Sequence, residues 1–364
     1  MKWKTYRLGN ILQFNPAERL AKGTFAKKVP MDLLQPRTRA ISGFEMVSYT
    51  GGNKFRNGDT LMARITPCLE NGKTAYVSIL DEDEVGFGST EYIVFRNIEG
   101  VTDSKYIYYF VTNPWFRNIA IKSMVGSSGR QRVQLAVLEN LVVNLPPLAE
   151  QKRIADILGA LDDKIELNRR INDNLEELGK VLYNQILNSG YVGSQHNLGE
   201  FIDICSGKSI KPGRKGLYPI LGANGEIGRT NDFLFDGRFI YTGRVGTLGK
   251  ICRVEDEKVW MSDNTLVIKP RIGYNFIYFA LKNMNLYSYN VGSTQPLIRQ
   301  SDMKGIKISL PNHIILQDFE QMCDSLFRQI NKNNKQNMIL SSLRDTLLPK
   351  LMSGELSVEE VSFD

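Results

Sequence analysis

Two long stretches of this 364-residue chain carry apolar residues at steps of three and four, the spacing of one helix face. The first stretch follows Pro146 and Pro147, and almost nothing after them would break a helix. Its apolar positions are Ile154, Leu158, Leu161, Ile165, Ile171, Leu175, Leu178 and Leu182. Because this stripe is narrow, it favours a seam between two helices over the wide apolar face of a core helix. We therefore predict long helices over 147–190 and 311–354.

The second stretch repeats the first at a distance of 165 residues. Polar positions coincide as well as apolar ones, since Asn168 falls on Asn333 and Asn172 on Asn337. An asparagine in such a seam lowers stability but fixes register and partner. If the helices pack antiparallel, the asparagine pairs meet near the middle of the seam. The predicted seam residues are Leu161, Ile165, Asn168, Asn172 and Leu175 in the first helix and Leu326, Ile330, Asn333, Asn337 and Leu340 in the second.

The blocks that precede the two helices repeat more loosely. TYRLGNILQF at 5–14 resembles QHNLGEFIDI at 195–204, and GSSGRQRVQ late in the first block resembles GSTQPLIRQ late in the second. Two pairs of basic residues also align: Arg64 with Arg244, and Lys73 with Lys250. The order block, helix, divergent block, similar helix indicates an internal duplication.

Within each block, short runs bounded by Gly, Asn and Asp predict strands. The clearest are DTLMARI, KTAYVSI, TEYIVFRN, RFIYTGR, GKICRV and NTLVIKP. SKYIYYFVTN and YNFIYFALKN predict a short helix late in each block. The predicted fold is α+β: two mixed α/β domains separated by two long helices packed as an antiparallel coiled coil, with a pseudo-two-fold internal repeat.

The predicted boundaries are 1–146 and 191–310 for the domains, 147–190 and 311–354 for the helices, and 355–364 for an acidic tail. An alternative stays open, in which the long stretches are ordinary core helices of one large α/β protein. Helices of that kind seldom exceed about 25 residues, which favours the paired arrangement.

Net charge alternates along the chain. Residues 1–146 carry 19 Lys and Arg against 13 Asp and Glu, and residues 196–310 carry 16 against 10, so that each block has a net charge of +6. The helical regions 147–195 and 311–364 are slightly acidic, at −2 and −3. Two equally basic blocks suggest two surfaces for one polyanion, although a solubilising surplus of charge is the simpler alternative.

Helix length then predicts the kind of polyanion site. A helix of about 38 residues at 1.5 Å each is roughly 57 Å long. DNA presents similar groove geometry about every 34 Å, so domains held this far apart can contact two stretches of one duplex. Because the blocks differ in sequence, we predict a split, asymmetric site with an unread gap.

Composition excludes several classes of protein. The N-terminal MKWKTYRLGN lacks the apolar run of a signal peptide, and no run approaches 18 apolar residues. The cysteines are scattered, and His196 and His313 complete no zinc site at a usual spacing. We therefore expect a cytoplasmic protein with free thiols, no structural metal and no membrane partner.

Several segments resemble catalytic motifs, but each lacks a residue that the motif requires. TNPWF at 112–116 lacks the second proline of an amino-methyltransferase motif, and NLPPLA at 144–149 lacks its aromatic. ENGKT at 70–74 lacks the glycine spacing of a Walker loop, and EDEKV at 255–259 lacks the upstream aspartate of a nuclease. We predict no catalysis by this chain and no cofactor of its own. Two rivals remain: a fused methyltransferase or nuclease with unrecognised motifs, and a non-catalytic coiled-coil scaffold.

Candidates for DNA contact are cations and amides in glycine-rich turns, where the backbone can approach DNA closely. Arginine can pair with guanine and glutamine with adenine, whereas lysine more often contacts phosphate. For any one of these residues, plain surface exposure is the alternative. The candidates are Arg64, Lys73, Arg130, Gln131, Arg132 and Gln134 in the first block and Lys208, Lys211, Arg214, Lys215, Arg244, Lys250, Gln295, Arg299 and Gln300 in the second.

Three segments together resemble the specificity subunit of type I restriction–modification systems. They are LPPLAEQKRIADILGALDDKIELNRRINDNLEEL, its echo LPNHIILQDFEQMCDSLFRQINKNNKQNMILSSLRDTLLPKLMSGEL, and GSTQPLIRQSDMKGIKISLP, typical of the end of a target-recognition domain. The resemblance covers the whole chain. The helix opening from Pro147 to Gln151 is a quite specific motif of the family, and the second copy departs from it with PNHIILQDF.

This resemblance implies a division of labour. Each target-recognition domain reads one half of a bipartite DNA site, and the helices set the gap and dock the partners. Two modification subunits bring S-adenosylmethionine and methylate adenine, and restriction subunits add ATP- and Mg²⁺-dependent translocation and cleavage. The chain itself is implied to be non-catalytic and to hold none of these cofactors.

Overall fold

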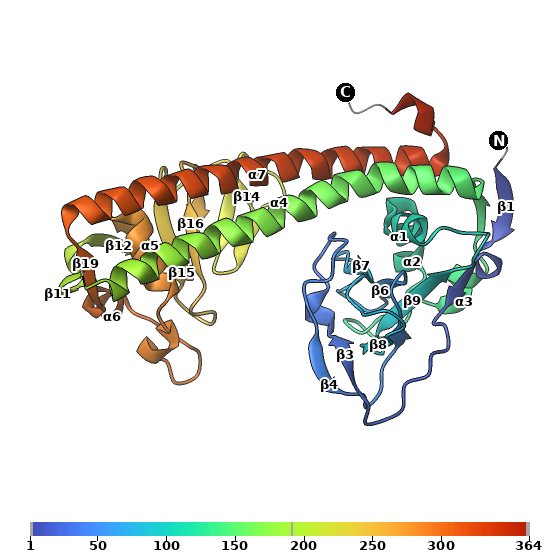
Figure 1. Cartoon of the computed structure of the whole chain (residues 1–364), viewed down its shortest axis with the longest axis horizontal. Coiled ribbons are helices and arrows are strands. Elements are labelled where there is room, and N and C mark those ends of the chain that lie inside the picture. Colours follow the sequence, from blue (N-terminus) through green and yellow to red (C-terminus); the bar gives the residue numbers. More distant parts are fainter. Residues whose placement is uncertain (1–2, 191, 362–364) are drawn as a thin grey trace. The chain divides into compact units, whose positions relative to one another are not determined.

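The computed structural model describes residues 3–190 and 192–361, so that the last three residues of the predicted acidic tail lie outside the described part. Contacts divide the chain into two compact units. The first comprises residues 1–169 together with 334–364, and the second comprises residues 170–333. Each unit therefore contains one mixed domain and a segment of both long helices (Figure 1).

The first unit is built on two four-stranded sheets. One has the order β2 (Leu12–Phe14), β9 (Tyr92–Asn97), β6 (Thr60–Ala63), β7 (Thr74–Tyr76), and the other has the order β4 (Glu45–Ser48), β3 (Phe25–Val29), β8 (Gly86–Gly88), β5 (Lys54–Phe55). Strands β1 (Lys4–Arg7) and β10 (Val142–Leu145) form a separate pair. The helices are η1 (Leu8–Asn10), η2 (Met31–Leu33), α1 (Ser104–Thr112), α2 (Pro114–Lys122), α3 (Leu135–Glu139) and, in the C-terminal segment, η5 (Val358–Glu360).

The second unit has a four-stranded and a three-stranded sheet. Their orders are β12 (Ile202–Ser206), β18 (Thr265–Pro270), β15 (Phe239–Gly243), β16 (Ile251–Val254), and β14 (Gly225–Thr230), β13 (Tyr218–Gly222), β17 (Trp260–Met261). Strands β11 (Val192–Asn197) and β19 (Lys307–Pro311) pair separately. The helices are η3 (Leu198–Glu200), α5 (Tyr274–Lys282), η4 (Leu286–Tyr289) and α6 (Gln300–Gly305).

The two units share one topology. The order β2-β9-β6-β7 matches β12-β18-β15-β16, and in both second sheets one strand pair is parallel, β3 with β8 and β13 with β17. The long helices α4 (Leu148–Asn188) and α7 (His313–Ser353) each have 41 residues and begin 165 residues apart. The internal duplication predicted from the sequence is therefore confirmed, together with the predicted strands and the two short late helices.

The long helices pack antiparallel, as predicted. In the first unit, Asp162 of α4 accepts a hydrogen bond from Arg344 of α7 (2.6 Å), and Asn168 donates to Asn337 (2.8 Å). As numbering rises along α4 it falls along α7, which is the antiparallel direction. In the second unit, Asn333 donates to Asn172 (2.8 Å). The buried Asn168 has two partners across the seam, because its side chain also donates to Gln336 (2.9 Å).

The ten predicted seam residues are all buried or half-buried. Two further stripe positions, Leu178 and Leu343, are instead 46% and 38% exposed. The reason is geometric: a helix of 3.6 residues per turn drifts away from a seam that repeats every 3.5. The start of α4 also serves a second purpose, since Ile154 and Leu158 lie in the apolar core of the first domain. The first turns of α4 therefore also pack as a core helix does, which was the alternative interpretation of the sequence pattern.

The two helix openings differ where their sequences do. The fully buried Gln151 of α4 donates to the carbonyls of Val101 (3.1 Å) and Pro146 (2.9 Å) and accepts from the backbone of Asp103 (3.0 Å). It thereby joins the start of α4 to the start of α1. In α7, Leu316 occupies the equivalent position, and Glu320 accepts from the backbone of Asn275 and Phe276 at the start of α5. The two helix starts are therefore joined by different side chains in the two units.

Candidate nucleic-acid interface

Arg64 and Arg244 occupy the same backbone position in the two units. Each directly follows the third strand in the order of its four-stranded sheet, β6 or β15. The Arg64 amide donates to Glu91 (2.9 Å), and its carbonyl accepts from Val133 (2.9 Å). The Arg244 amide likewise donates to Asn264 (2.8 Å), and its carbonyl accepts from Ile298 (3.1 Å). Each unit thus fixes one arginine between the start of a neighbouring strand and a loop late in the domain.

The side chains of these two arginines have different neighbours. Arg64 is half-buried and donates to the carbonyl of Val133 (3.2 Å), while its Nε is buried without a partner among the described residues. Among the described residues, the Arg244 side chain donates one long hydrogen bond, to Ser206 Oγ (3.5 Å), and Gln300 donates to the same oxygen (3.1 Å). An arginine and a glutamine therefore meet at one hydroxyl in the second unit.

The two Gly-Lys pairs are turns. Gly72 and Gly249 have φ of +83° and +87°, the left-handed conformation that glycine adopts at low cost. Lys73 is half-buried and donates to the carbonyl of Met31 (2.8 Å). Lys250 is exposed and donates to the carbonyl of Asn224 (3.2 Å). Turn geometry accounts for the two repeated glycines, and the DNA contacts of Lys73 and Lys250 stay a prediction.

The late loop of the first unit lies beside the Arg64 turn. Arg132 forms an ion pair with Glu91 through two nitrogens, at 2.9 and 2.6 Å, and its backbone pairs with Val125. Arg130 and Gln134 are exposed, and Gln131 is half-buried. No sequence pattern indicates that Glu91 neutralises Arg132, because their contact spans 41 residues and depends on the fold.

The equivalent loop of the second unit joins the Arg244 turn in the same way. Gly246 donates to the carbonyl of Pro296 (2.9 Å), and Val291 donates to Leu297 (2.9 Å). Gln295 and Arg299 are exposed on this loop, and Gln300 is half-buried. The fold therefore brings Arg244, Ser206 and Gln300 together, and Ser206 is a neighbour that sequence patterns did not identify.

A second basic element is the loop 207–216, with sequence GKSIKPGRKG. Trp260 Nε1 donates to the carbonyl of Lys208 (2.8 Å), and Arg229 donates to the carbonyl of Gly216 (3.0 Å). These bonds hold both ends of the loop to the second sheet of the unit. Lys208, Lys211, Arg214 and Lys215 are all exposed, and none of their side chains pairs with another described residue. We call this segment the basic loop.

The near-miss catalytic motifs have structural contacts. Asn113 of TNPWF caps α2 by accepting from the backbone of Trp115 (2.9 Å). Glu255 of EDEKV pairs with Arg238 (3.2 Å) and Arg253. Within residues 3–190 and 192–361, no three His, Cys, Asp or Glu side chains are grouped as metal ligands. In the same ranges, every helix is too short or too polar to cross a lipid bilayer.

The fold and the loops define a class of protein that consists of two copies of one α+β domain with two long helices. It is a tandem duplication in which each α+β domain presents a fixed turn arginine beside a polar loop and is packed on a segment of the paired helices. The duplication leaves the strand frame unchanged while the loop residues differ.

The chain belongs to the family described as type I restriction modification DNA specificity domain, whose model matches residues 1–177 and again residues 195–339. A similar protein is the type I restriction enzyme MjaIX specificity subunit of Methanocaldococcus jannaschii, 27% identical in an alignment 319 positions long that covers 73% of this chain and 73% of that protein. The HindI specificity subunit of Haemophilus influenzae is 22% identical and covers 97% of this chain and 99% of its own. The fold resembles the type I restriction–modification S subunit of M. genitalium, with a TM-score of 0.55, 18% identity and 96% coverage of both chains.

Proposed function

We propose that this chain reads a bipartite DNA site for a type I restriction–modification complex, one half-site with each unit. The observation that carries the proposal is the shared frame around Arg64 and Arg244. In both units the same pattern of backbone hydrogen bonds holds the arginine at an equivalent position, but the side chains nearby differ: Glu91 in the first unit and Ser206 in the second. Two domains that share a backbone geometry but carry different side chains are expected to prefer different bases, because side-chain contacts to the bases determine sequence preference.

Affinity for the DNA backbone comes in this proposal from the exposed cations. The basic loop places four of them on ten residues without an acidic side chain. Each phosphate that such a cation neutralises releases counterions, so that binding weakens with salt by a slope of about −0.9 per contact. Arg130, Gln134, Gln295 and Arg299 are exposed next to the arginine turns and are the proposed base readers. The fixed ion pair of Arg132 makes it a poorer candidate, because contact with DNA would first require separation from Glu91.

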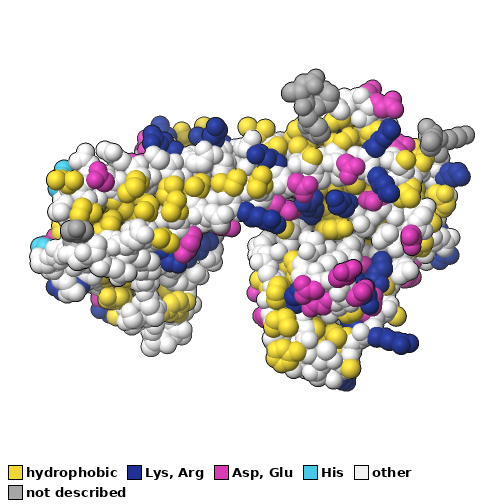
Figure 2. Space-filling model, viewed as in Figure 1, with side chains coloured by type: hydrophobic (Ala, Val, Ile, Leu, Met, Phe, Trp, Pro, Cys, Tyr) yellow, Lys and Arg dark blue, Asp and Glu magenta, His cyan; other side chains and the backbone are white. Residues whose placement is uncertain are grey.

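The chemistry is assigned in this proposal to partner subunits, two modification subunits that use S-adenosylmethionine and restriction subunits that use ATP and Mg²⁺. Apolar side chains exposed on the long helices support a docking role. In the first unit they include Leu167, Met338, Ile339 and Leu343, and in the second they include Leu178, Val181, Ile314 and Met322. Figure 2 shows hydrophobic side chains at the surface of the helices in the second unit. One such set on each unit suggests one modification subunit for each.

Methylation mapping tests the proposal. The chain is produced with its modification subunits in a host without other adenine methylation, and modified adenines are located by long-read sequencing. We expect one motif with two defined, unequal halves and an undefined gap. Methyl transfer by the purified chain alone would instead support a fused enzyme, and a complex that modifies no defined motif would support a scaffold.

Neutralising the basic loop tests its assignment. Lys208, Lys211, Arg214 and Lys215 are replaced together by glutamine, and binding of the complex to its duplex is measured over a range of salt concentrations. If all four contact phosphates, the slope of log K against log salt should fall in magnitude by up to about 3.6 units. An unchanged slope would remove the loop from the interface.

A further inference from the structure

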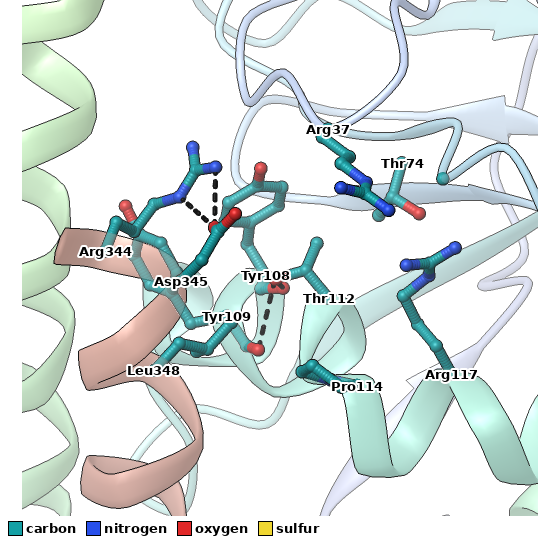
Figure 3. Close-up of a pocket in the computed structure, with 11 residues that line it drawn as sticks. Arg37, Thr74, Tyr108, Tyr109, Thr112, Pro114, Arg117, Arg344, Asp345 and Leu348 are labelled. Atoms are coloured by element: carbon teal, nitrogen blue, oxygen red, sulfur yellow. Dashed lines mark hydrogen bonds and ion pairs between the residues drawn. The ribbon is translucent and has the colours of Figure 1, made fainter. Parts of the chain in front are cut away.

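A cavity of about 240 Å³ lies within the first unit, separate from the loops assigned to DNA. It is bounded by β7, by α1 and α2, and by the part of α7 that belongs to this unit. Its size is somewhat below the roughly 300–1,000 Å³ of typical small-molecule sites, so its ligand should be small. The cavity is drawn in Figure 3.

Two arginines face each other across this cavity. Figure 3 shows the side chains of Arg37 and Arg117 pointing toward one another. Neither guanidinium is in an ion pair with any described carboxylate, although both line the cavity. Arg117 is held in place by donating to the carbonyls of Leu69 (2.9 Å) and Glu70 (3.3 Å). Burial, and then the charge of Arg37, lower the pKa of Arg117, which is the direction expected when two cations share a site without an anion.

The backbone is shaped to bring these two side chains together. Gly72 has φ of +83°, and a Cβ built there would lie 3.2 Å from Arg37 Cγ and 3.4 Å from Arg117 Nη2. Arg37 itself has φ of +55°, an unusual conformation for a side chain larger than glycine. Its amide donates to the carbonyl of Gly72 (3.0 Å). The fold thus places Arg37 beside Arg117 in a backbone conformation that costs free energy.

Unused hydrogen-bonding atoms lie at the same site. Thr74 lines the cavity, is 1% exposed, and its hydroxyl has no partner among the described residues. The Nε of Arg117 is also buried without a partner. Such groups are costly unless something binds them. On the far side, Arg344 donates to both Asp345 (3.0 and 2.8 Å) and Asp162 (2.6 Å), so that these three groups together carry one negative charge against the two positive charges of Arg37 and Arg117.

We propose that this cavity binds a phosphate group, supplied by inorganic phosphate or a small phosphate monoester. A dianion balances Arg37 and Arg117, its tetrahedral oxygens suit two guanidinium forks, and a further oxygen can accept from the Thr74 hydroxyl. The nearly complete burial of Thr74 favours a free ligand over the backbone of a DNA duplex. The proposal does not depend on DNA reading by the loops.

Calorimetric titration of the full chain with sodium phosphate, at constant ionic strength set with sodium chloride, tests this site. We expect saturable binding of one phosphate, and competition between phosphate and glycerol 3-phosphate if the site accepts a monoester. Arg117→Gln should abolish the heat of binding. Arg19→Gln should leave it unchanged, because Arg19 is exposed and does not line the cavity.

Thr74→Val separates a ligand contact from a structural role. The valine removes an unpartnered hydroxyl, so the ligand-free protein should melt at the same temperature or higher, while phosphate binding becomes at least about tenfold weaker. Absence of saturable binding, or equal phosphate affinity in the wild type and both cavity variants, would overturn the proposal. Displacement of the bound phosphate by a cognate duplex would overturn the claim that the site is separate from DNA.

Discussion

Asp162 and Asp163 are sequence neighbours on α4, yet their carboxylates lie in different surroundings. Asp162 is 2% exposed and accepts from Tyr109 (2.7 Å) and Arg344 (2.6 Å). Asp163 pairs with Arg39, but its side chain is 66% exposed. The Asp162 carboxylate is buried in an ion pair between α4 and α7, whereas the Asp163 carboxylate faces solvent and its partner Arg39 also pairs with Glu166 (3.0 Å). Such neighbours allow a matched test of what the seam contributes to stability.

Asp162→Ala is expected to lower the free energy of unfolding by about 1–3 kcal/mol, because the buried Arg344 keeps only the half-exposed Asp345 as a partner and the Tyr109 hydroxyl loses its acceptor. Asp163→Ala should lower it by no more than about 1 kcal/mol, the range of exposed pairs. Urea denaturation followed by circular dichroism measures both. Equal losses in the two variants would mean that the Asp162 pair is not buried as described.

Glu176 of α4 gives a pH-dependent contribution in the second unit. Burial by itself would raise the pKa of Glu176, but hydrogen bonds from Lys282 and Tyr278 and the positive charge of Lys282 outweigh it, and the pKa is lowered from 4.5. A carboxylate with a lowered folded-state pKa contributes stability that is present above its unfolded pKa and is lost as pH falls through the folded value.

Glu176→Gln should therefore be less stable than the wild type at pH 7, and the difference should shrink as the pH falls below about 4.5. Unfolding midpoints of both proteins, measured from pH 7 to pH 3, check this. Because all other carboxylates are common to the two proteins, their titration cancels in the difference. A difference that is constant over this range would contradict the ionised, paired state of Glu176.

At the scale of elements, α4 contains two glycines with opposite surroundings. A Cβ at Gly179 would lie 2.5 Å from Phe279 Cζ on α5, whereas at Gly159 the nearest atom, Arg39 Nη1, is 3.7 Å away. Helix α5 can therefore approach α4 closely only where α4 has no side chain. Gly159 has no such role, so its presence only weakens the helix.

Gly179→Ala is expected to destabilise the chain by about 1–3 kcal/mol through overpacking against Phe279. Gly159→Ala should stabilise it by roughly 0.5–1 kcal/mol, because alanine favours the helix and meets no close contact. Thermal melts of the two variants beside the wild type give the signs. Stabilisation by both substitutions would show that α5 does not pack on Gly179.

Elements with a strong periodic pattern were the ones that sequence analysis predicted. The long helices followed from apolar residues at steps of three and four, and the duplication from asparagines at matching places. The sheet β4-β3-β8-β5 was not predicted, because β5 has two residues and β8 is Gly86-Phe87-Gly88, which shows no alternation. A Cβ at Gly86 would lie 2.5 Å from a ring carbon of Phe55, so these glycines serve close packing that only the fold reveals.

The candidate DNA-contact residues likewise include features that a sequence pattern predicts and others that only the fold reveals. Repetition in the sequence located Arg64 and Arg244 at equivalent positions, and in the structure their backbones have equivalent hydrogen-bond partners. Their side-chain neighbours Glu91 and Ser206 are distant in sequence and were missed. The paired arginines Arg37 and Arg117 were also missed, because their approach depends on positive φ values that no pattern indicates.

At the scale of the whole molecule, the proposed spacer role of the helices predicts the length of the unread gap. Removing residues 169–172 and 333–336 deletes four positions from each helix on matching sides of the Asn168–Asn337 pair. Four residues are about one turn and about 6 Å, so that both helix faces are nearly kept. The gap should shorten by roughly two base pairs at about 3.4 Å each, with both half-sites unchanged.

Methylation mapping of the complex with this double deletion, compared with the undeleted complex, measures the length of the gap directly. A change in the bases of either half-site would show that the helices take part in reading DNA. An unchanged gap would show that they do not set the distance.

The central claim is that each unit reads one half-site independently of the other. The most direct measurement replaces residues 1–146 by the corresponding domain of another family member and maps methylated adenines in a complex with the same modification subunits. One half of the motif should change to that of the donor, while the other half and the gap stay as they were. If both halves change, or if the motif is unaltered, the assignment of one half-site to each unit is contradicted.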